Sequence, residues 1–225
     1  MGFWSSIGSA ISSGFSAVCS AVSSIGSALS SFATSVGSII LSSANTVATV
    51  IQSLGSAFGI IKPDEKIDDL GDRALQAAEQ GIRPENFETY NAYMAEIRAF
   101  ELKPEKSNQY SMETKQLAGI GITCKAIEEK FELRQGMAGQ MAAMVALNPS
   151  FFTAHRLEGW FQSETDINKI IDYFENKLGA SDSFKIEQQL IATEKQQSNK
   201  SEWQIEIELD QVKADLHQAI EKFTH

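Results

Sequence analysis

The sequence predicts an all-α protein, in which an N-terminal amphipathic Gly/Ser/Ala-rich helix or helical hairpin precedes a helical bundle body. Three observations predict this class. Apolar residues recur every three or four positions along most of the chain, which is the period of a helix with one apolar face. Residues typical of helix caps and helix ends bound many of these periodic segments. No segment shows the alternating pattern with short turns that predicts β-hairpins.

Charge divides the chain of 225 residues into two parts. Residues 1–61 contain no Asp, Glu, Lys, Arg or His, so the 19 basic and 29 acidic side chains, 48 together, all lie in residues 62–225. We therefore expect an uncharged amphipathic membrane-active segment at 1–61 and an acidic helical soluble domain at 62–225. The net charge of −10 argues against nucleic acid as a partner, and it would repel anionic lipid headgroups. Any action on membranes must then be hydrophobic.

The large apolar residues of the uncharged segment fall on one face of a helix. Their spacing alternates between four and three residues, and the positions between them are almost all Ser, Gly or Ala. A gap at residues 42–46 predicts a bend, although turns near Gly26 or Gly37 remain alternatives. The residues predicted to enter a membrane are Ile7, Ile11, Phe15, Val18, Val22, Ile25, Leu29, Phe32, Val36, Ile39, Val47, Val50, Leu54 and Phe58.

Such a segment would form a weak helix in water, because Ser and Gly both lower helix stability. In a bilayer, each backbone group must be hydrogen-bonded internally, which favours the helix, and small residues let helices approach closely. The glycines predicted to pack against neighbouring helices are Gly8, Gly14, Gly26, Gly37, Gly55 and Gly59. Two other interpretations stay open: a flexible low-complexity tail, and a coiled-coil seam for oligomerisation in water.

The segment has neither the basic start and compact apolar region of a secretory signal nor the roughly 18 consecutive apolar residues of an ordinary membrane span. We therefore expect a protein that is soluble in the producing cell and is secreted without a cleavable signal.

The body is expected to consist of successive amphipathic helices. Ser163 and Asp166 resemble a capping box, and the last two helices could be continuous through residues 194–201. The charge-free stretch 135–154 predicts a buried core helix that ends at Asn148-Pro149, with a second membrane-active or partner-docking element as the alternative. The other predicted helices run from Asp64 to Gly81, from Pro84 to just before Pro104, from Met112 to Phe131, from Ser163 to Gly179, and through 184–191 and 205–223.

No catalytic, cofactor or metal site is predicted. The three histidines are scattered, Cys19 and Cys124 lie far apart, and no nucleotide-binding, zinc-protease or hydrolase motif occurs. Glu158 is expected to form a surface ion pair with Arg156 rather than a catalytic cluster with His155. An enzyme carried on an amphipathic anchor stays a third possibility.

The small size, the acidic charge and the glycines at positions 8, 14, 26, 37, 55 and 59 among Ser and Ala give the chain a further likeness. It resembles the small glycine-zipper-like pore-forming antibacterial effectors that type VI secretion delivers between bacteria. The resemblance covers about the first quarter of the chain, and these glycines are not evenly spaced by four. It implies depolarisation of a competitor's inner membrane, a secretion carrier or chaperone, and a membrane immunity protein as partner.

These observations lead us to expect a pore-forming toxin that inserts its N-terminal helical segment into a target-cell membrane and oligomerises there with copies of itself. Asp64, Glu65, Asp68 and Asp69 would surround one mouth of the pore and attract cations. The alternative is a structural or assembly protein, of a virion or a membrane, whose N-terminal helix oligomerises or anchors without conducting ions.

Overall fold

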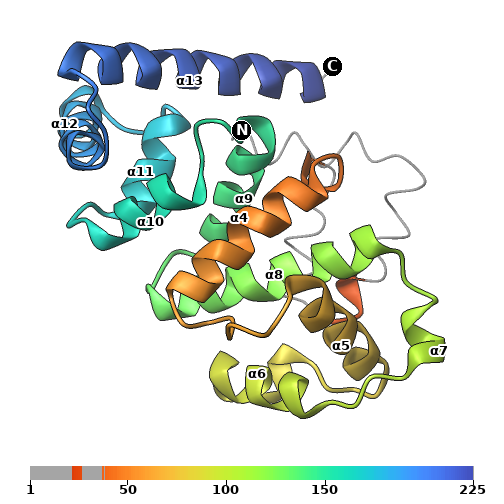
Figure 1. The fold of residues 1–225 in the computed structure, drawn as a ribbon. Helices are drawn as coiled ribbons and strands as arrows, with labels where there is room; N and C mark the ends of the chain where they lie inside the picture. The colour runs from red at the N-terminus through yellow and green to blue at the C-terminus, as the bar shows by residue number, and fades with distance from the viewer. Residues whose placement is uncertain (1–21, 27–36, 38, 225) are drawn as a thin grey trace.

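The computed structural model describes residues 22–26, 37 and 39–224, and every regular element in those residues is a helix. The predicted all-α class is confirmed. In Figure 1, α12 and α13 lie at one end of the molecule, α5, α6 and α7 lie at the other, and α4, α8 and α9 lie between them. The helices are α4 (Ala44–Ala57), α5 (Ile67–Glu79), the 3-10 helix η2 (Pro84–Asn86), α6 (Tyr90–Ala99), α7 (Pro104–Ser107), α8 (Met112–Lys130), α9 (Met137–Leu147), α10 (Ala154–Gln162), α11 (Ile167–Phe174), α12 (Ala180–Gln197) and α13 (Glu202–Thr224).

Helix α8 lies at the centre of the packing. It contacts α4, α5, α6 and α9, and most of its residues are buried. The predicted boundary at residues 61 and 62 falls between α4 and α5, and both of these helices pack on α8. The described residues on the two sides of the charge boundary therefore share one hydrophobic core.

Two glycines set an unusually close crossing of α5 with α8. A Cβ atom added at Gly71 would lie 1.9 Å from the carbonyl oxygen of Lys115, and one added at Gly119 would lie 1.9 Å from the carbonyl oxygen of Ile67. Beside this crossing, the buried carboxylate of Asp72 pairs with Lys115 at 2.9 Å. Backbone contact and a charged pair therefore join these helices.

The uncharged segment turns where the apolar stripe is interrupted. The helix that ends at Leu41 is followed by a turn at Ser42 and Ser43, and α4 begins at Ala44. Gly26 also lies outside a helix, whereas Gly37 is helical.

Two body helices have the predicted extents, and a third has the predicted end. Helix α5 ends just before Gly81, whose φ of 82° suits glycine. Helices α8 and α9 agree with the predicted ranges. Helix α9 is a buried core helix that ends before Pro149, as expected.

Several predicted helix boundaries are wrong for local reasons; α5, for example, begins at Ile67 and not at Asp64. Pro84 opens only the short η2, because the backbone is extended again at Phe87. The second helix therefore begins at Tyr90, where the Thr89 side chain accepts a hydrogen bond from the amide of Ala92. The predicted capping box is absent: Asp166 alone caps α11, while the Ser163 hydroxyl donates to the carbonyl of Trp160 at the end of α10.

Further along the chain, α11 ends at Phe174, and Gly179 is the N-cap of α12 instead of a helix terminator. Helices α12 and α13 are separate, because Ser198 and Ser201 use their side chains on nearby groups. The Ser198 hydroxyl donates to the carbonyl of Glu194, and the Ser201 hydroxyl donates to the side-chain oxygen of Gln204.

Candidate functional site

Most of the residues predicted to enter a membrane and described by the structure are buried. Val22, Ile25, Ile39, Val47 and Leu54 are at most 2% exposed, and Val50 and Phe58 are partly buried against the core. The other predicted positions, which are Ile7, Ile11, Phe15, Val18, Leu29, Phe32 and Val36, lie outside the described residues. In this structure, the described part of the apolar stripe faces the protein interior.

Helix α4 is the longest described element of the charge-free segment. Its buried face, formed by Val47, Ile51 and Leu54, packs against α8 and α9, and its far end reaches α10. There the Phe58 ring meets Phe131 and Phe161, with ring centroids 4.7 and 4.9 Å away. Apolar contact therefore covers the whole inner side of the helix.

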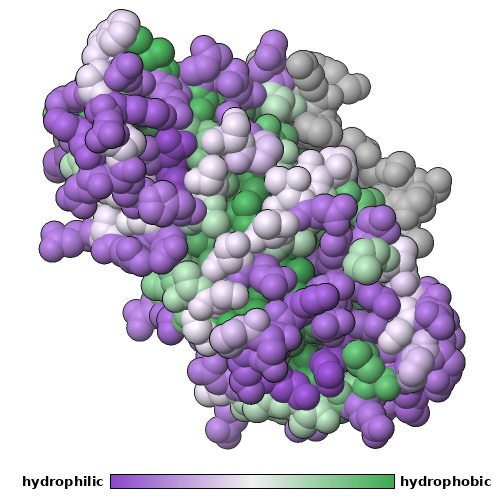
Figure 2. Space-filling view, viewed as in Figure 1, coloured by the Kyte–Doolittle hydropathy of each residue, from purple (hydrophilic) through white to green (hydrophobic). Residues whose placement is uncertain are grey.

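The outer face of α4 is polar but uncharged. Figure 2 shows a pale to green band across the middle of this side of the molecule, between two purple ends. On this face the Thr49 hydroxyl donates to the carbonyl of Asn45 at 2.8 Å, and the Ser53 hydroxyl donates to the carbonyl of Thr49 at 2.9 Å. These hydroxyl groups thus have hydrogen-bond partners within the helix itself.

Side-chain amides of α4 form hydrogen bonds with α8 and with the start of α5. Near its start, the Asn45 side chain accepts a hydrogen bond from Gln116 of α8 at 2.7 Å. Near its end, the Gln52 side chain accepts from the amide of Ile67 and donates to the carbonyl of Glu65. The contact with Ile67 links α4 to the first residue of α5.

Arg98 of α6 holds the connection between α4 and α5. Its guanidinium donates to both carboxylate oxygens of Glu65, at 2.6 and 3.0 Å, and to the carbonyl of Ile60 at 2.6 Å. Burial raises the pKa of Glu65, but the hydrogen bonds and positive charges of Arg98 and Lys62 outweigh burial and hold that pKa below its usual value. The ion pair is only partly buried, so it adds little to the stability of the fold and mainly fixes the position of the connection between α4 and α5.

The predicted glycines have different surroundings. A Cβ added at Gly55 would meet the side chains of Ile61 and Thr123, at 2.8 and 3.1 Å, so Gly55 lets α4 approach α8. Gly59 instead ends the helix, with φ of 67°, and the amide of Ile60 donates to the carbonyl of Gly55 in a Schellman-type end. Gly26 and Gly37 are buried, whereas Gly8 and Gly14 lie outside the described residues.

The four predicted pore-mouth acids lie in and just after the connection between α4 and α5. Asp64 and Asp69 are exposed, Asp68 is half-buried in the first turn of α5, and Glu65 is occupied by Arg98. Three of the four carboxylates therefore lack the ion pair that Glu65 makes.

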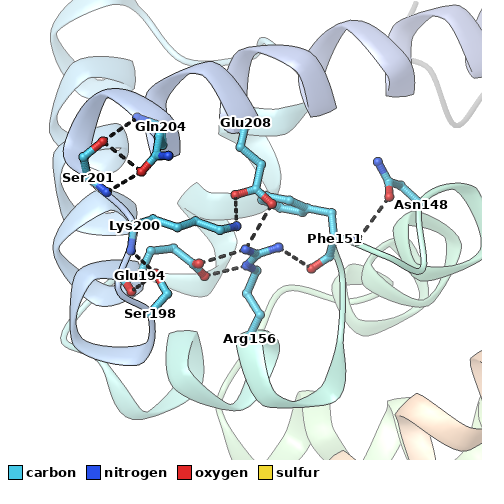
Figure 3. Close-up of polar contacts among 9 residues, drawn as sticks. All are labelled: Asn148, Phe151, Arg156, Glu194, Ser198, Lys200, Ser201, Gln204 and Glu208. Carbon is cyan, nitrogen blue, oxygen red and sulfur yellow. Dashed lines mark hydrogen bonds and ion pairs between the residues drawn. The ribbon is translucent and has the colours of Figure 1, made fainter.

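The expected surface ion pair between Arg156 and Glu158 is wrong. Figure 3 shows the Arg156 guanidinium enclosed between α10, α12 and α13, where it donates to both carboxylate oxygens of Glu194, at 2.5 and 2.8 Å, and to the carbonyl of Phe151 at 2.7 Å. Glu208 of α13 lies 3.4 Å from it and also pairs with Lys200. Glu194 lies 38 residues from Arg156, too far along the chain for helical spacing to reveal the pair.

Comparison with protein-family models, curated proteins and solved structures found no match. Functional inference therefore rests on the chain itself. Within the part of the chain that the structure describes, no cluster of three or more His, Cys, Asp or Glu side chains could hold a metal ion. Across the same residues, no helix combines the length and the hydropathy needed to cross a bilayer. Cys124 is a buried free thiol, and burial raises its pKa well above the usual value.

Proposed function

We propose that this protein inserts α4 and the uncharged segment around it into a target membrane and permeabilises that membrane to ions. The observation that carries the proposal is the chemistry of α4: a helix with no charged side chain packs on the core of an acidic protein, with the Thr49 and Ser53 hydroxyls bonded to its own backbone. Moving such a helix into lipid exposes no charge and breaks none of these internal hydrogen bonds.

The length of the charge-free chain supports the proposal. Helix α4 has 14 residues, or roughly 21 Å at 1.5 Å per residue, which is shorter than a hydrocarbon core of about 30 Å. A continuous helix over residues 39–61 would reach roughly 34 Å. The turn at Ser42 and Ser43 and the helix end at Gly59 interrupt that run, and Ser43 makes no side-chain cap hydrogen bond to α4.

The pore is proposed to form from several copies that meet through small residues such as Gly55, where close approach is already seen. Asp64, Asp68 and Asp69 then surround one mouth and attract cations, and Glu65 joins them once Arg98 releases it. Delivery by type VI secretion and neutralisation by a membrane immunity protein are proposed on the resemblance alone.

A reversible tether tests whether α4 must leave α8. Asn45 and Gln116 are joined by a hydrogen bond, so Asn45→Cys and Gln116→Cys can be bridged by a short bis-maleimide with a reducible centre, in a Cys19→Ser background. Current is then measured across planar phosphatidylcholine bilayers. We expect no current from the tethered protein and recovery of current after reduction.

The matched control tether joins Glu79→Cys to Lys106→Cys, an ion pair between α5 and α7 that does not involve α4. This protein should conduct before and after reduction. Conductance by the protein tethered at α4 would contradict the proposal. Verified lipid binding without current from any form would favour the structural or assembly role. The full chain is used because removal of residues 1–61 would also remove α4 from the core.

A further inference from the structure

Helix α9 shares the most distinctive property of α4. Among the described helices from α4 onward, only these two have no charged side chain. The charge-free run around α9 covers residues 135–154, inside the part of the chain that holds every charged residue. This run has the roughly 20 residues that a membrane-spanning helix needs.

Burial alone does not explain the missing charge. Helix α8 is also largely buried, yet it carries Lys115 and Lys125 at half-buried positions. The half-buried positions of α9 are Gln140, Ala146 and Leu147, and none of them is charged. A core helix in this acidic body thus normally has charged side chains at its edges, and α9 does not.

The two charge-free helices are neighbours. Helix α9 packs directly against α4, and both pack against α8. Two contacts with α8 hold the start of α9: the Glu128 carboxylate accepts from the amide of Ala138 at 3.2 Å, and the Cys124 thiol donates to the carbonyl of Ala138 at 3.5 Å. Gly136, with φ of 86°, forms the joint between α8 and α9.

The surface of α9 also suits contact between helices in lipid. Ala138, Ala142 and Ala146 recur at every fourth position, with Gly139 and Ala143 beside them. Small residues at this spacing let two helices approach closely in a bilayer, where packing replaces the hydrophobic effect as the source of association.

We propose that α9 enters the bilayer together with α4, so that each chain inserts two charge-free helices while the charged helices stay at the membrane surface. This inference rests on the proposed function. Pro149 and Asn148 lie within the run, and a membrane helix tolerates such a break where a neighbouring helix bonds the freed backbone groups.

Depth-dependent quenching tests the inference. Three proteins in a Cys19→Ser background each have one added cysteine, which carries the dye NBD, at Ala146→Cys of α9, Ser53→Cys of α4, or Asp210→Cys of α13. Cys124 stays because its thiol is buried. Each protein is added to phosphatidylcholine vesicles whose acyl chains carry a nitroxide quencher. We expect strong quenching at positions 146 and 53, and none at 210.

The outcomes separate the two proposals. Quenching at 53 without quenching at 146 would overturn the role of α9 and leave the proposed function standing. Quenching at neither position would overturn both. Quenching at 146 alone, or at all three positions, would overturn joint and selective entry of α4 and α9.

A charged side chain at position 146 gives a second test of whether α9 enters the bilayer. A Lys near the centre of a membrane helix lowers its insertion by about a hundredfold, whereas a half-buried surface site accepts Lys in water. Ala146→Lys should therefore reduce release of dye from phosphatidylcholine vesicles by about a hundredfold with little change in Tm. Asp210→Lys is the control and should leave release unchanged; unchanged release by Ala146→Lys would contradict the inference.

Discussion

Helices α4 and α5 follow each other in the chain and pack on the same helix, α8, by different chemistry. Helix α4 is attached mainly by aliphatic side chains, including Ile51 and Leu54. Helix α5 also buries apolar side chains such as Leu70 and Leu75, and it adds backbone contact at Gly71 and the buried pair of Asp72 with Lys115. Lipid can replace the first kind of contact, because hydrocarbon chains pack against Leu and Ile as well as protein does. It cannot replace the second.

The same division extends over the described fold. Helix α9 belongs with α4, since it is charge-free and apolar. Helices α10, α12 and α13 belong with α5, since Arg156 of α10 pairs with the buried Glu194 of α12 and with Glu208 of α13. Two helices of this molecule, α4 and α9, are therefore buried mainly by apolar contact, which lipid can also provide. The charged helices are held together in addition by buried ion pairs, which lipid cannot provide.

The largest expected effect is on the α5–α8 crossing. Gly119→Leu would place a side chain where even a Cβ lies 1.9 Å from the backbone of Ile67, so the two helices cannot keep their contact. We expect a loss beyond the about 1–3 kcal/mol usual for an overfilled core, and no cooperative thermal transition by circular dichroism. Gly179→Leu is the control: a Cβ there meets nothing within 4 Å, and the free energy of unfolding should fall by about 1 kcal/mol or less.

The next largest effect is expected at the buried charges of the other end. Arg156→Met removes the partner of Glu194 and leaves a carboxylate in a site that is only 4% exposed. The free energy of unfolding measured with urea should fall by about 3–5 kcal/mol. The double variant with Glu194→Gln should recover part of the loss. If the double variant were less stable than Arg156→Met, the charge pair would not be the source of the effect.

These two predictions also show what the sequence could and could not reveal. The periodicity of apolar residues predicted α8 and α9 because a helix with a buried face repeats every three to four residues. It did not reveal the crossing at Gly71 and Gly119, because glycine inside a helical pattern first indicates a weak helix. The signal was present as two glycines within otherwise strong helices, which often have a packing reason.

The candidate site was predictable only in part. The absence of charge in residues 1–61 and 135–154 is visible in the sequence, but the contact between α4 and α9 is not, since it depends on how α8 arranges them. The partner of Arg156 was missed because spacing reveals neighbours within a helix and not across three helices. The ion pair of Glu65 with Arg98 was missed for the same reason.

A smaller effect is expected for α4, where one substitution should lower the stability of the fold and raise membrane permeabilisation. Leu54→Ala empties a fully buried site, so the free energy of unfolding should fall by about 2–5 kcal/mol. The same change costs insertion only about 0.5 kcal/mol. The variant should therefore be less stable to urea and release more dye from phosphatidylcholine vesicles at equal concentration. Ser53→Ala on the exposed face should change neither quantity. Less release by Leu54→Ala would mean that leaving the protein core does not limit insertion.

The smallest effect concerns a buried carboxylate of the charged helices. Both carboxylate oxygens of Glu175 are buried, and Lys177 is its ion-pair partner. Burial, with a smaller contribution from Asp172, raises the pKa of Glu175 above 4.5, against the opposing charges of Lys177 and Arg134. The folded state therefore holds this proton more tightly than the unfolded state, and stability falls as pH rises through the raised pKa.

Glu175→Gln should consequently be more stable than the unmodified protein at neutral pH, and the difference should shrink as pH falls toward 4.5. Urea denaturation at several pH values measures it. Glu65→Gln gives the opposite sign, because the pKa of Glu65 is lowered: the stability from its pair with Arg98 is present above pH 4.5 and is lost as pH falls through the folded-state pKa. Equal pH dependence of the two variants would show that the Glu175 site is hydrated. If the Glu175 site excludes water, acid should stabilise the contacts of Glu175 among the charged helices while it weakens the pair of Glu65 with Arg98 at the connection between α4 and α5.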